Sequence, residues 1–219
     1  MTERYALIPA KDLAQAKARL ADVLPAGDRR ALAVAMFRDV LAAAIACQAI
    51  DGVAVVSRDA EVLSIAEATG AEALAEPGNL NEALTSAAEQ LAARGVEQLV
   101  VLAADLPLAD AEAIEQVALA GADVALVPSR DGGTNALLIP LSAIAFQFGA
   151  DSAARHLASA QQAGLRPLRL DVPSLALDID TPDDLQRLQQ IASSGGRAGG
   201  HTLAALRRMG LVEPARRPA

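Results

Sequence analysis

Aspartates at two places in the sequence have the setting of ligands for a divalent cation. Asp105 follows an apolar run at residues 101–104, which would place it at the tip of a buried strand, near any phosphate bound there. Asp178 and Asp180 alternate with apolar residues, and in an extended segment residues two apart face the same side. Adjacent carboxylates repel each other, and a bound divalent cation relieves that repulsion. We therefore predict cation binding at these aspartates, with capping of the next turn as the alternative for Asp105.

A basic segment near the start of the chain could bind phosphates. Lys11, Lys17 and Arg19 lie between an expected strand at residues 5–9 and an expected helix from residue 28. Loops of this length in compact domains are usually functional or mobile. Three cations at the carboxyl end of a first strand suit a triphosphate. No glycine-rich phosphate cradle is present, so solvated surface charge is the alternative.

Two further segments offer hydrogen-bond donors for an anion. Two glycines precede Thr134, and they let the backbone turn tightly and approach a ligand closely. Gly149 precedes a helix that we expect to begin at Ser152, and a helix N-terminus offers free N–H groups and a positive dipole end. An ordinary turn between strands and a simple N-cap at Ser152 are the alternatives. His156 follows Ser152 by one helical turn, and we expect a structural role for it.

The elements that must position these residues are indicated by alternating strand and helix patterns. Strands are predicted at residues 5–9, 53–57, 98–103, 124–128, 136–140 and 165–170. Helices are predicted at residues 28–48, 59–68, 79–93, 110–120, 152–163 and 182–191, the first with an apolar face of Leu32, Met36, Phe37, Val40, Leu41 and Ile45. This alternation predicts a three-layer α/β/α sandwich with a mainly parallel central sheet. Ligands should then bind at the carboxyl ends of the strands.

Two helix starts carry capping residues. Asn79 and Glu82 have the spacing of a capping box. Thr181 is a good N-cap before a proline, and Asp184 occupies the third helical position. We therefore assign Asp183 and Asp184 to helix capping rather than to the cation site.

Composition limits the class of partner. The 219-residue chain has a formal charge of −8, which argues against a nucleic-acid partner held by phosphate contacts. No stretch reaches the ~18 apolar residues of a membrane span, and the apolar run at the start is too short for a signal peptide. We therefore expect a cytoplasmic protein without membrane contact. Cys47 is the only cysteine, so no intrachain disulfide can form.

The last residues differ from the rest in composition. Residues 193–200 read SSGGRAGG, which is typical of a flexible linker, and residues 195–219 contain five arginines against one glutamate. We therefore divide the chain into a catalytic domain at residues 1–194 and a flexible basic tail at residues 195–219. Within this tail, Leu203, Leu206 and Met209 could form one or two turns of helix, and a tail that packs against a partner is the alternative.

The motifs follow one another in an order that resembles a known family. Between residues 6 and 188 the chain reads IPAK…AKARL, GNLNEAL, VLAADLP, GGTNALL, FGADS…H and LDIDTPDDL. This order is similar to that of the 2-phospho-L-lactate and phosphoenolpyruvate guanylyltransferases of coenzyme F-420 biosynthesis. The resemblance implies a GT-A-like nucleotidyltransferase fold, of the nucleotide-diphospho-sugar transferase type.

The resemblance also implies roles for individual residues. In the family, aspartates matching Asp105, Asp178 and Asp180 hold Mg²⁺, and positions matching Thr134, Gly149 and Ser152 bind the phosphorylated acid. The loop with Lys11, Lys17 and Arg19 is implied to handle the GTP phosphates, with Asn79 and Asn81 near the nucleoside. Asp105 and Lys17 are the expected catalytic residues.

The implied reaction is transfer of GMP from GTP to a small phosphorylated carboxylic acid, with release of pyrophosphate. Phosphoenolpyruvate, 2-phospho-L-lactate and 3-phospho-D-glycerate differ by a few atoms, so the residues do not choose among them, and a homodimer is left open. A molybdopterin-type or sugar nucleotidyltransferase is one alternative, although such enzymes usually carry a glycine-rich first loop where this chain has IPAK. A non-catalytic nucleotide sensor is another, and three intact aspartates argue against it.

Overall fold

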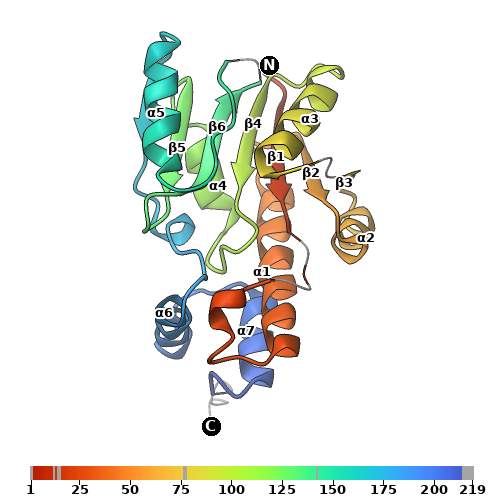
Figure 1. The fold of residues 1–219 in the computed structure, drawn as a ribbon, viewed down its shortest axis with the longest axis vertical. Coiled ribbons are helices and arrows are strands. Elements are labelled where there is room, and N and C mark those ends of the chain that lie inside the picture. Colours follow the sequence, from red (N-terminus) through yellow and green to blue (C-terminus); the bar gives the residue numbers. More distant parts are fainter. Residues whose placement is uncertain (1, 12, 14–15, 76–77, 142, 214–219) are drawn as a thin grey trace.

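A seven-stranded sheet forms the centre of the molecule (Figure 1). The computed structural model describes residues 2–11, 13, 16–75, 78–141 and 143–213. The strand order is β3-β2-β1-β4-β6-β5-β7, with β1 at Arg4–Pro9, β2 at Gly52–Ser57, β3 at Glu72–Ala75, β4 at Gln98–Leu102, β5 at Val124–Pro128, β6 at Thr134–Pro140 and β7 at Pro167–Arg169. All pairings are parallel except those of β6, which runs antiparallel to β4 and β5. The predicted mainly parallel sheet is therefore confirmed.

Helices cover both faces of this sheet (Figure 1). They are α1 at Ala26–Ala46, α2 at Ala60–Ala68, α3 at Leu80–Ala92, α4 at Ala111–Ala118, α5 at Ser152–Gln162, α6 at Pro182–Ser193 and α7 at Gly200–Arg208, with 3-10 turns η2 at Ala18–Leu20 and η3 at Pro173–Leu175. Successive strand residues face opposite sides: Leu7 packs with α3 and α5, whereas Ala6 and Ile8 pack with α1, α2 and α4. The three-layer α/β/α sandwich is confirmed.

The antiparallel direction of β6 determines which residues lie together at one edge of the sheet. Parallel strands β1 and β4 end at this edge, and the antiparallel β6 begins there. The backbone N–H of Ala103 donates to the carbonyl oxygen of Asn135 at 2.8 Å. Residues just after β4 therefore lie beside the first residues of β6, which brings Asp105 toward the segment after the two glycines.

Some predicted elements need correction. Strand β3 was not predicted, and its short sequence (EALA) carries no β-branched or aromatic signal. Ile45 was placed on the buried face of the first helix and is 47% exposed, whereas its neighbours Ala44 and Cys47 are buried in the core that packs on the sheet. Both capping boxes are confirmed, at Asn79 with Glu82 and at Thr181 with Asp184.

The prediction of a flexible tail from residue 195 is wrong for the part of it that forms α7. This helix lies beside the first half of α1 (Figure 1), and it buries Thr202, Ala205 and Leu206 completely. Its apolar residues belong to a third cluster, below the sheet, together with Leu20, Leu24, Leu32, Met36, Leu177, Ile179, Leu185, Leu188 and Val212. Residues on both sides of position 194 thus share one core. Residues 214–219 lie outside the described part of the chain.

The start of α7 is held by a residue of α1. Gly199, at the N-cap, has no side chain to offer, so the first N–H groups of the helix need other partners. Asp39 accepts from the N–H of His201 at 3.0 Å and from that of Thr202 at 2.7 Å, and its residue is only 6% exposed. A side chain at position 199 would collide with the Asp39 carboxylate, which explains the glycine.

Among the described residues, no helix combines the length and the apolar character that crossing a membrane requires.

Candidate functional site

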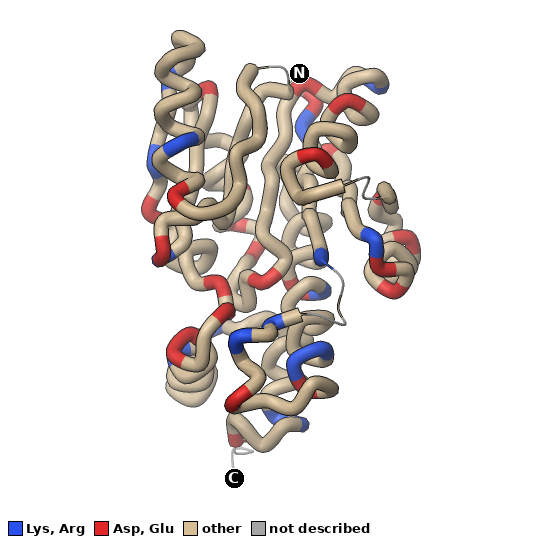
Figure 2. The backbone as a smooth tube through the Cα atoms, in the orientation of Figure 1, with Lys and Arg blue, Asp and Glu red and all other residues tan. Residues whose placement is uncertain are grey.

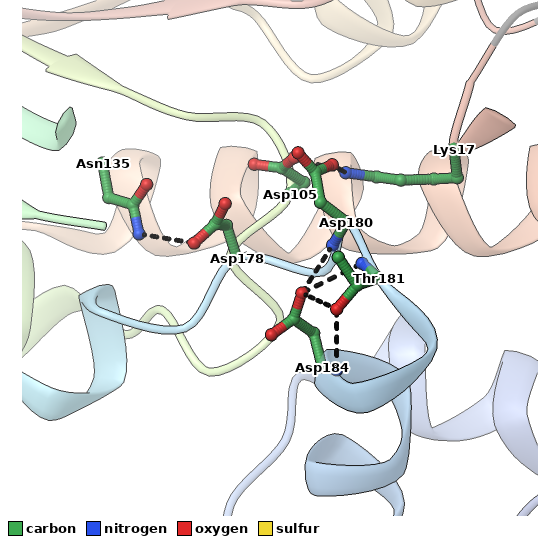
Figure 3. Close-up of polar contacts among 7 residues, drawn as sticks. All are labelled: Lys17, Asp105, Asn135, Asp178, Asp180, Thr181 and Asp184. Carbon is green, nitrogen blue, oxygen red and sulfur yellow. Dashed lines mark hydrogen bonds and ion pairs between the residues drawn. The ribbon is translucent and has the colours of Figure 1, made fainter. Parts of the chain in front are cut away.

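The side chain of Lys17 joins two of the predicted aspartates. Its ammonium group forms ion pairs with Asp105 and with Asp180, the latter at 2.9 Å (Figure 3). The Lys17 side chain is only 8% exposed, whereas those of Asp105 and Asp180 are 27% and 44% exposed. Three segments far apart in the sequence therefore meet at one charged group: the loop before η2, the turn after β4 and the segment before α6.

The backbone of Lys17 is held in an unusual conformation. With φ 56° and ψ 41° it is left-handed, which costs a residue with a side chain ~1–2 kcal/mol. Such conformations persist where the surroundings enforce them, and they cluster at functional sites. The two ion pairs supply that restraint and aim the ammonium group toward the sheet edge.

Asp178 lies beside this group with a different partner. Asn135, at the start of β6, donates from its side-chain amide to the Asp178 carboxylate at 3.2 Å and to the carbonyl oxygen of Leu175 at 3.0 Å. The predicted alternation is confirmed, since Leu177 and Ile179 are buried in the third cluster while Asp178 and Asp180 remain partly exposed. The role of Asn135 was not predicted, although it adjoins the Thr134 that was singled out.

The electrostatics of the site show an excess of negative charge. Burial, and then the nearby Asp105, raise the pKa of Asp178 above its ordinary value. Burial would also raise the pKa of Asp180, but the attraction and hydrogen bond of Lys17, with Arg19 and Lys11 further away, lower it instead. Burial alone would lower the pKa of Lys17, and the two carboxylates outweigh it and raise that pKa. The ammonium group of Lys17 thus pairs with two of the three carboxylates, and the third, Asp178, has the amide of Asn135 as its partner.

Lys11 and Arg19 are exposed and belong to the same basic loop as Lys17. Figure 2 shows the basic segments that follow β1 close to the acidic segments below β4. Both side chains act on Asp180 through space, so they lie within electrostatic reach of the carboxylates. Their predicted contacts with GTP phosphates stay a prediction.

The predicted cation site can be tested against the chemistry of its donors. Within the described ranges, no three His, Cys, Asp or Glu side chains are already arranged as a set of metal ligands. Instead, the ammonium group of Lys17 lies between Asp105 and Asp180, with Asp178 next to them (Figure 3). Carboxylate oxygens are the ligands that Mg²⁺ prefers, and the surplus negative charge here favours a further cation. The donor chemistry of these residues suits Mg²⁺, and its binding here stays a prediction.

The predicted acid-binding residues Thr134 and Ser152 lie together, but they face each other. Their hydroxyl oxygens are 2.9 Å apart, and both residues are buried, at 8% and 1% exposure. Thr134 also contacts the Nδ1 atom of His156 at 3.2 Å. Ser152 is the first residue of α5, and the preceding Asp151, not Ser152, occupies the N-cap position. The alternative of a simple N-cap at Ser152 is therefore wrong.

The other residues predicted to bind the substrates are Gly149, Asn79 and Asn81. Gly149 is exposed and has φ 127°, a conformation that residues with side chains rarely adopt. Asn81 accepts from the backbone N–H of Phe148 at 2.8 Å and donates to its carbonyl oxygen at 3.2 Å. Asn79 caps α3. The side chain of Asn81 therefore holds the segment before Gly149 in place, and a contact of either asparagine with a nucleoside stays a prediction.

Comparison with known proteins identifies the family. A family described as "Guanylyl transferase CofC like" matches residues 4–218 of the chain. The chain belongs to this family. The match extends beyond the motifs, which end at residue 188, and it includes α7, in agreement with the shared core.

Two curated proteins similar to this CofC-like chain are named phosphoenolpyruvate guanylyltransferase. A phosphoenolpyruvate guanylyltransferase of Sphaerobacter thermophilus is 43% identical over 195 residues, which cover 87% of this chain and 94% of that protein. A phosphoenolpyruvate guanylyltransferase of Conexibacter woesei is 38% identical over 220 residues, covering 96% and 98%.

Solved structures agree on the fold of the CofC-like chain. A Desulfovibrio desulfuricans protein classed as a nucleotide-diphospho-sugar transferase superposes with a TM-score of 0.76 at 22% identity, covering 96% of this chain and 97% of that one. A 4-diphosphocytidyl-2C-methyl-D-erythritol synthase superposes with a TM-score of 0.58 at 17% identity, covering 86% and 97%. The predicted nucleotidyltransferase fold is confirmed.

Proposed function

We propose that this chain transfers GMP from GTP to the phosphate of a small phosphorylated carboxylic acid, with phosphoenolpyruvate as the first candidate, in coenzyme F-420 biosynthesis. The observation that carries the proposal is the cluster of three aspartates with Lys17 at the carboxyl ends of β1 and β4, in a chain of the CofC-like family. A relative that is 43% identical bears the name phosphoenolpyruvate guanylyltransferase, which favours this acid over the other two.

In the proposed reaction, a phosphate oxygen of the acid attacks the α-phosphorus of GTP. A new phosphorus–oxygen bond forms, the bond from the α-phosphorus to the bridging oxygen breaks, and pyrophosphate leaves with that electron pair. The attacking oxygen is already ionised near neutral pH, so the step needs no strong general base. Rate acceleration then comes from positioning and from neutralisation of charge.

Different residues of the cluster would provide the positioning and the charge neutralisation. Asp105, Asp178 and Asp180 would hold Mg²⁺, which supplies charge neutralisation at the phosphates when bound. Lys17 keeps Asp105 and Asp180 together and carries a positive charge toward the edge where phosphates would lie. Arg19 and Lys11, both exposed on the same loop, would contact the outer phosphates of GTP.

A competition assay tests the proposed function. The protein is given GTP, Mg²⁺ and an equimolar mixture of phosphoenolpyruvate, 2-phospho-L-lactate and 3-phospho-D-glycerate, and products are identified by mass while pyrophosphate is measured. We expect the guanylylated phosphoenolpyruvate to dominate. Parallel reactions with ATP, CTP and UTP, and with other phosphorylated acceptors, separate this activity from that of other nucleotidyltransferases. Pyrophosphate release without any guanylylated acid would contradict the proposal.

Substitutions of the two buried hydroxyl groups test the acid site. Ser152→Ala and Thr134→Val each remove one hydroxyl and keep the volume nearly unchanged. If these hydroxyls donate to the acid, kcat/KM for the acid should fall roughly ten- to a hundredfold, since a lost hydrogen bond to a charged group is worth ~1.5–3 kcal/mol. The Kd for GTP should change little. The measurements are steady-state kinetics with varied acid and calorimetric titration with GTP.

Ser159→Ala is the matched control for these two substitutions. Ser159 lies on the same helix, and its hydroxyl accepts a hydrogen bond from the side chain of Gln147 at 2.6 Å, whereas the hydroxyls of Thr134 and Ser152 contact each other. We expect acid kinetics close to those of the unmodified protein in this variant. Unchanged acid kinetics in Ser152→Ala and Thr134→Val would remove both residues from the acid site.

A further inference from the structure

His156 is completely buried and makes two hydrogen bonds that the proposed reaction does not require. Its Nε2 atom lies 3.0 Å from the backbone nitrogen of Gln147, and its Nδ1 atom lies 3.2 Å from the Thr134 hydroxyl. The ring also makes an edge contact with Phe148, with ring centroids 5.0 Å apart. The ring therefore links α5 to the start of β6 and to the segment before Gly149.

The partner of Nε2 determines where the ring carries its proton. A backbone N–H can only donate, so Nε2 must accept from Gln147 and cannot carry a hydrogen itself. Burial, and then the nearby Arg155, lower the pKa of His156 to about 4, so the ring is neutral at physiological pH. A neutral ring has one N–H, which must be at Nδ1. The Nδ1–H group therefore donates to the Thr134 hydroxyl oxygen.

This tautomer decides whether the hydroxyl pair can donate to a ligand. Nδ1–H and the two hydroxyls provide three hydrogens, and the two contacts in the chain from His156 through Thr134 to Ser152 use two of them. One hydroxyl hydrogen thus has no acceptor among the contacts of the described residues. With the proton on Nε2, Thr134 would donate to Nδ1 and Ser152 to Thr134, and no hydrogen would remain.

We propose that His156 is a positioning residue of the acid site: its Nδ1–H group directs the hydroxyls of Thr134 and Ser152 so that the pair presents a hydrogen-bond donor to an anionic oxygen. This proposal rests on the proposed function, because it assigns the acid's carboxylate or phosphate as that anion. An anion can only accept, so a hydroxyl pair without a free hydrogen would repel it.

Two amide substitutions of His156 separate donation from packing. His156→Asn places an amide N–H near the position of Nδ1 and retains the donor to Thr134, without reaching Gln147. His156→Gln places its amide near the position of Nε2, within reach of Gln147, and no longer donates to Thr134. We expect KM for phosphoenolpyruvate to rise roughly three- to tenfold in His156→Gln, the size of one neutral hydrogen bond, and to stay within about twofold in His156→Asn. The KM for GTP should stay unchanged in both variants.

The position of the proton can be measured without any substitution. The chain has two histidines, and the other, His201, is exposed, so protein labelled with ¹⁵N-histidine gives two assignable rings. We expect a ¹⁵N–¹H correlation at Nδ1 of His156 and an unprotonated Nε2 from pH 5 to 8. A proton on Nε2, or equal rises of KM in both amide variants, would overturn the proposal. If no acid is guanylylated in any assay, the proposed function fails, while this measurement still decides the tautomer.

Discussion

Asp178→Asn should reduce kcat/KM by about 10²–10³-fold while leaving the fold intact. A metal ligand at a transferring phosphate contributes several kcal/mol to the transition state, and each 1.36 kcal/mol corresponds to a factor of ten. The amide oxygen of the new side chain can still accept from Asn135, which lies 3.2 Å from the carboxylate, so the local hydrogen bond survives. The loss should therefore appear in catalysis and not in folding.

The thermal stability of the Asp178→Asn variant should change in the opposite direction to its activity, or not at all. The folded state raises the pKa of Asp178 above its ordinary value of 3.8, chiefly by burial. A carboxyl whose pKa is higher in the folded state costs stability once the pH exceeds its unfolded pKa, and that cost persists at neutral pH. Removing the charge should leave Tm unchanged or raise it, while activity is lost. The measurements are Mg²⁺-dependent steady-state kinetics and thermal unfolding at pH 7.

Asp183→Asn is the matched control for Asp178→Asn. Asp183 is exposed in the first turn of α6, close in sequence to the cluster, and the substitution removes the same charge by the same chemistry. Activity should stay within about twofold of the unmodified protein, because an exposed charge outside the cluster contributes little. Mg²⁺-dependent turnover near normal in Asp178→Asn would contradict the metal assignment.

Ending the chain after Ser194 should abolish stable folding or lower Tm by well over 10 °C. The deletion removes Leu206 and Val212 from the third cluster, and burial of one such side chain stabilises by ~1.5–3 kcal/mol. It also removes both N–H groups that satisfy the buried Asp39 carboxylate. The sum is comparable with the whole stability of an ordinary domain, ~5–15 kcal/mol. The measurement is thermal unfolding of the purified truncated chain.

Two point substitutions test the same prediction if the truncated chain does not remain in solution. Leu206→Ala should cost ~2–5 kcal/mol, as expected for a large-to-small change in a core. Arg207→Ala, at the next and exposed position of α7, should cost less than ~0.5 kcal/mol. A truncated chain that melts within a few degrees of the full chain would show that α7 is dispensable for the fold. The same core holds Leu177 and Ile179 on either side of Asp178, so activity should fall together with stability.

Much of the local structure, and the family, could be predicted from the amino-acid sequence alone. Apolar periodicity predicted six of the seven strands and six of the seven α-helices that the described residues form, because burial of one face imposes a repeat on nearby residues. The alternation around Asp178 predicted correctly which side chains are buried, and the capping boxes placed the starts of α3 and α6. The order of short motifs identified the guanylyltransferase family before any geometry was known.

Contacts between distant segments were decided only by the tertiary structure. Lys17 meets Asp105 across 88 residues and Asp180 across 163, and no local pattern specifies such a pairing. The reversed direction of β6 brings Asn135 to Asp178, a contact that depends on strand order and not on any single strand. These pairs form only when distant segments meet around one sheet. The charged residues could therefore be predicted from the sequence, but their partners could not.

The start of α7 shows the physical reason most directly. Sequence patterns report a helix start through a local capping side chain, and Gly199 supplies none. The cap comes instead from Asp39, 162 residues before His201, and the apolar face of α7 is complete only against α1 and α6. A glycine-rich segment is predicted to be flexible when only the nearby residues in the sequence are considered. Here Gly199 allows a close approach to Asp39, and packing that only the folded chain provides makes the last helix part of the core.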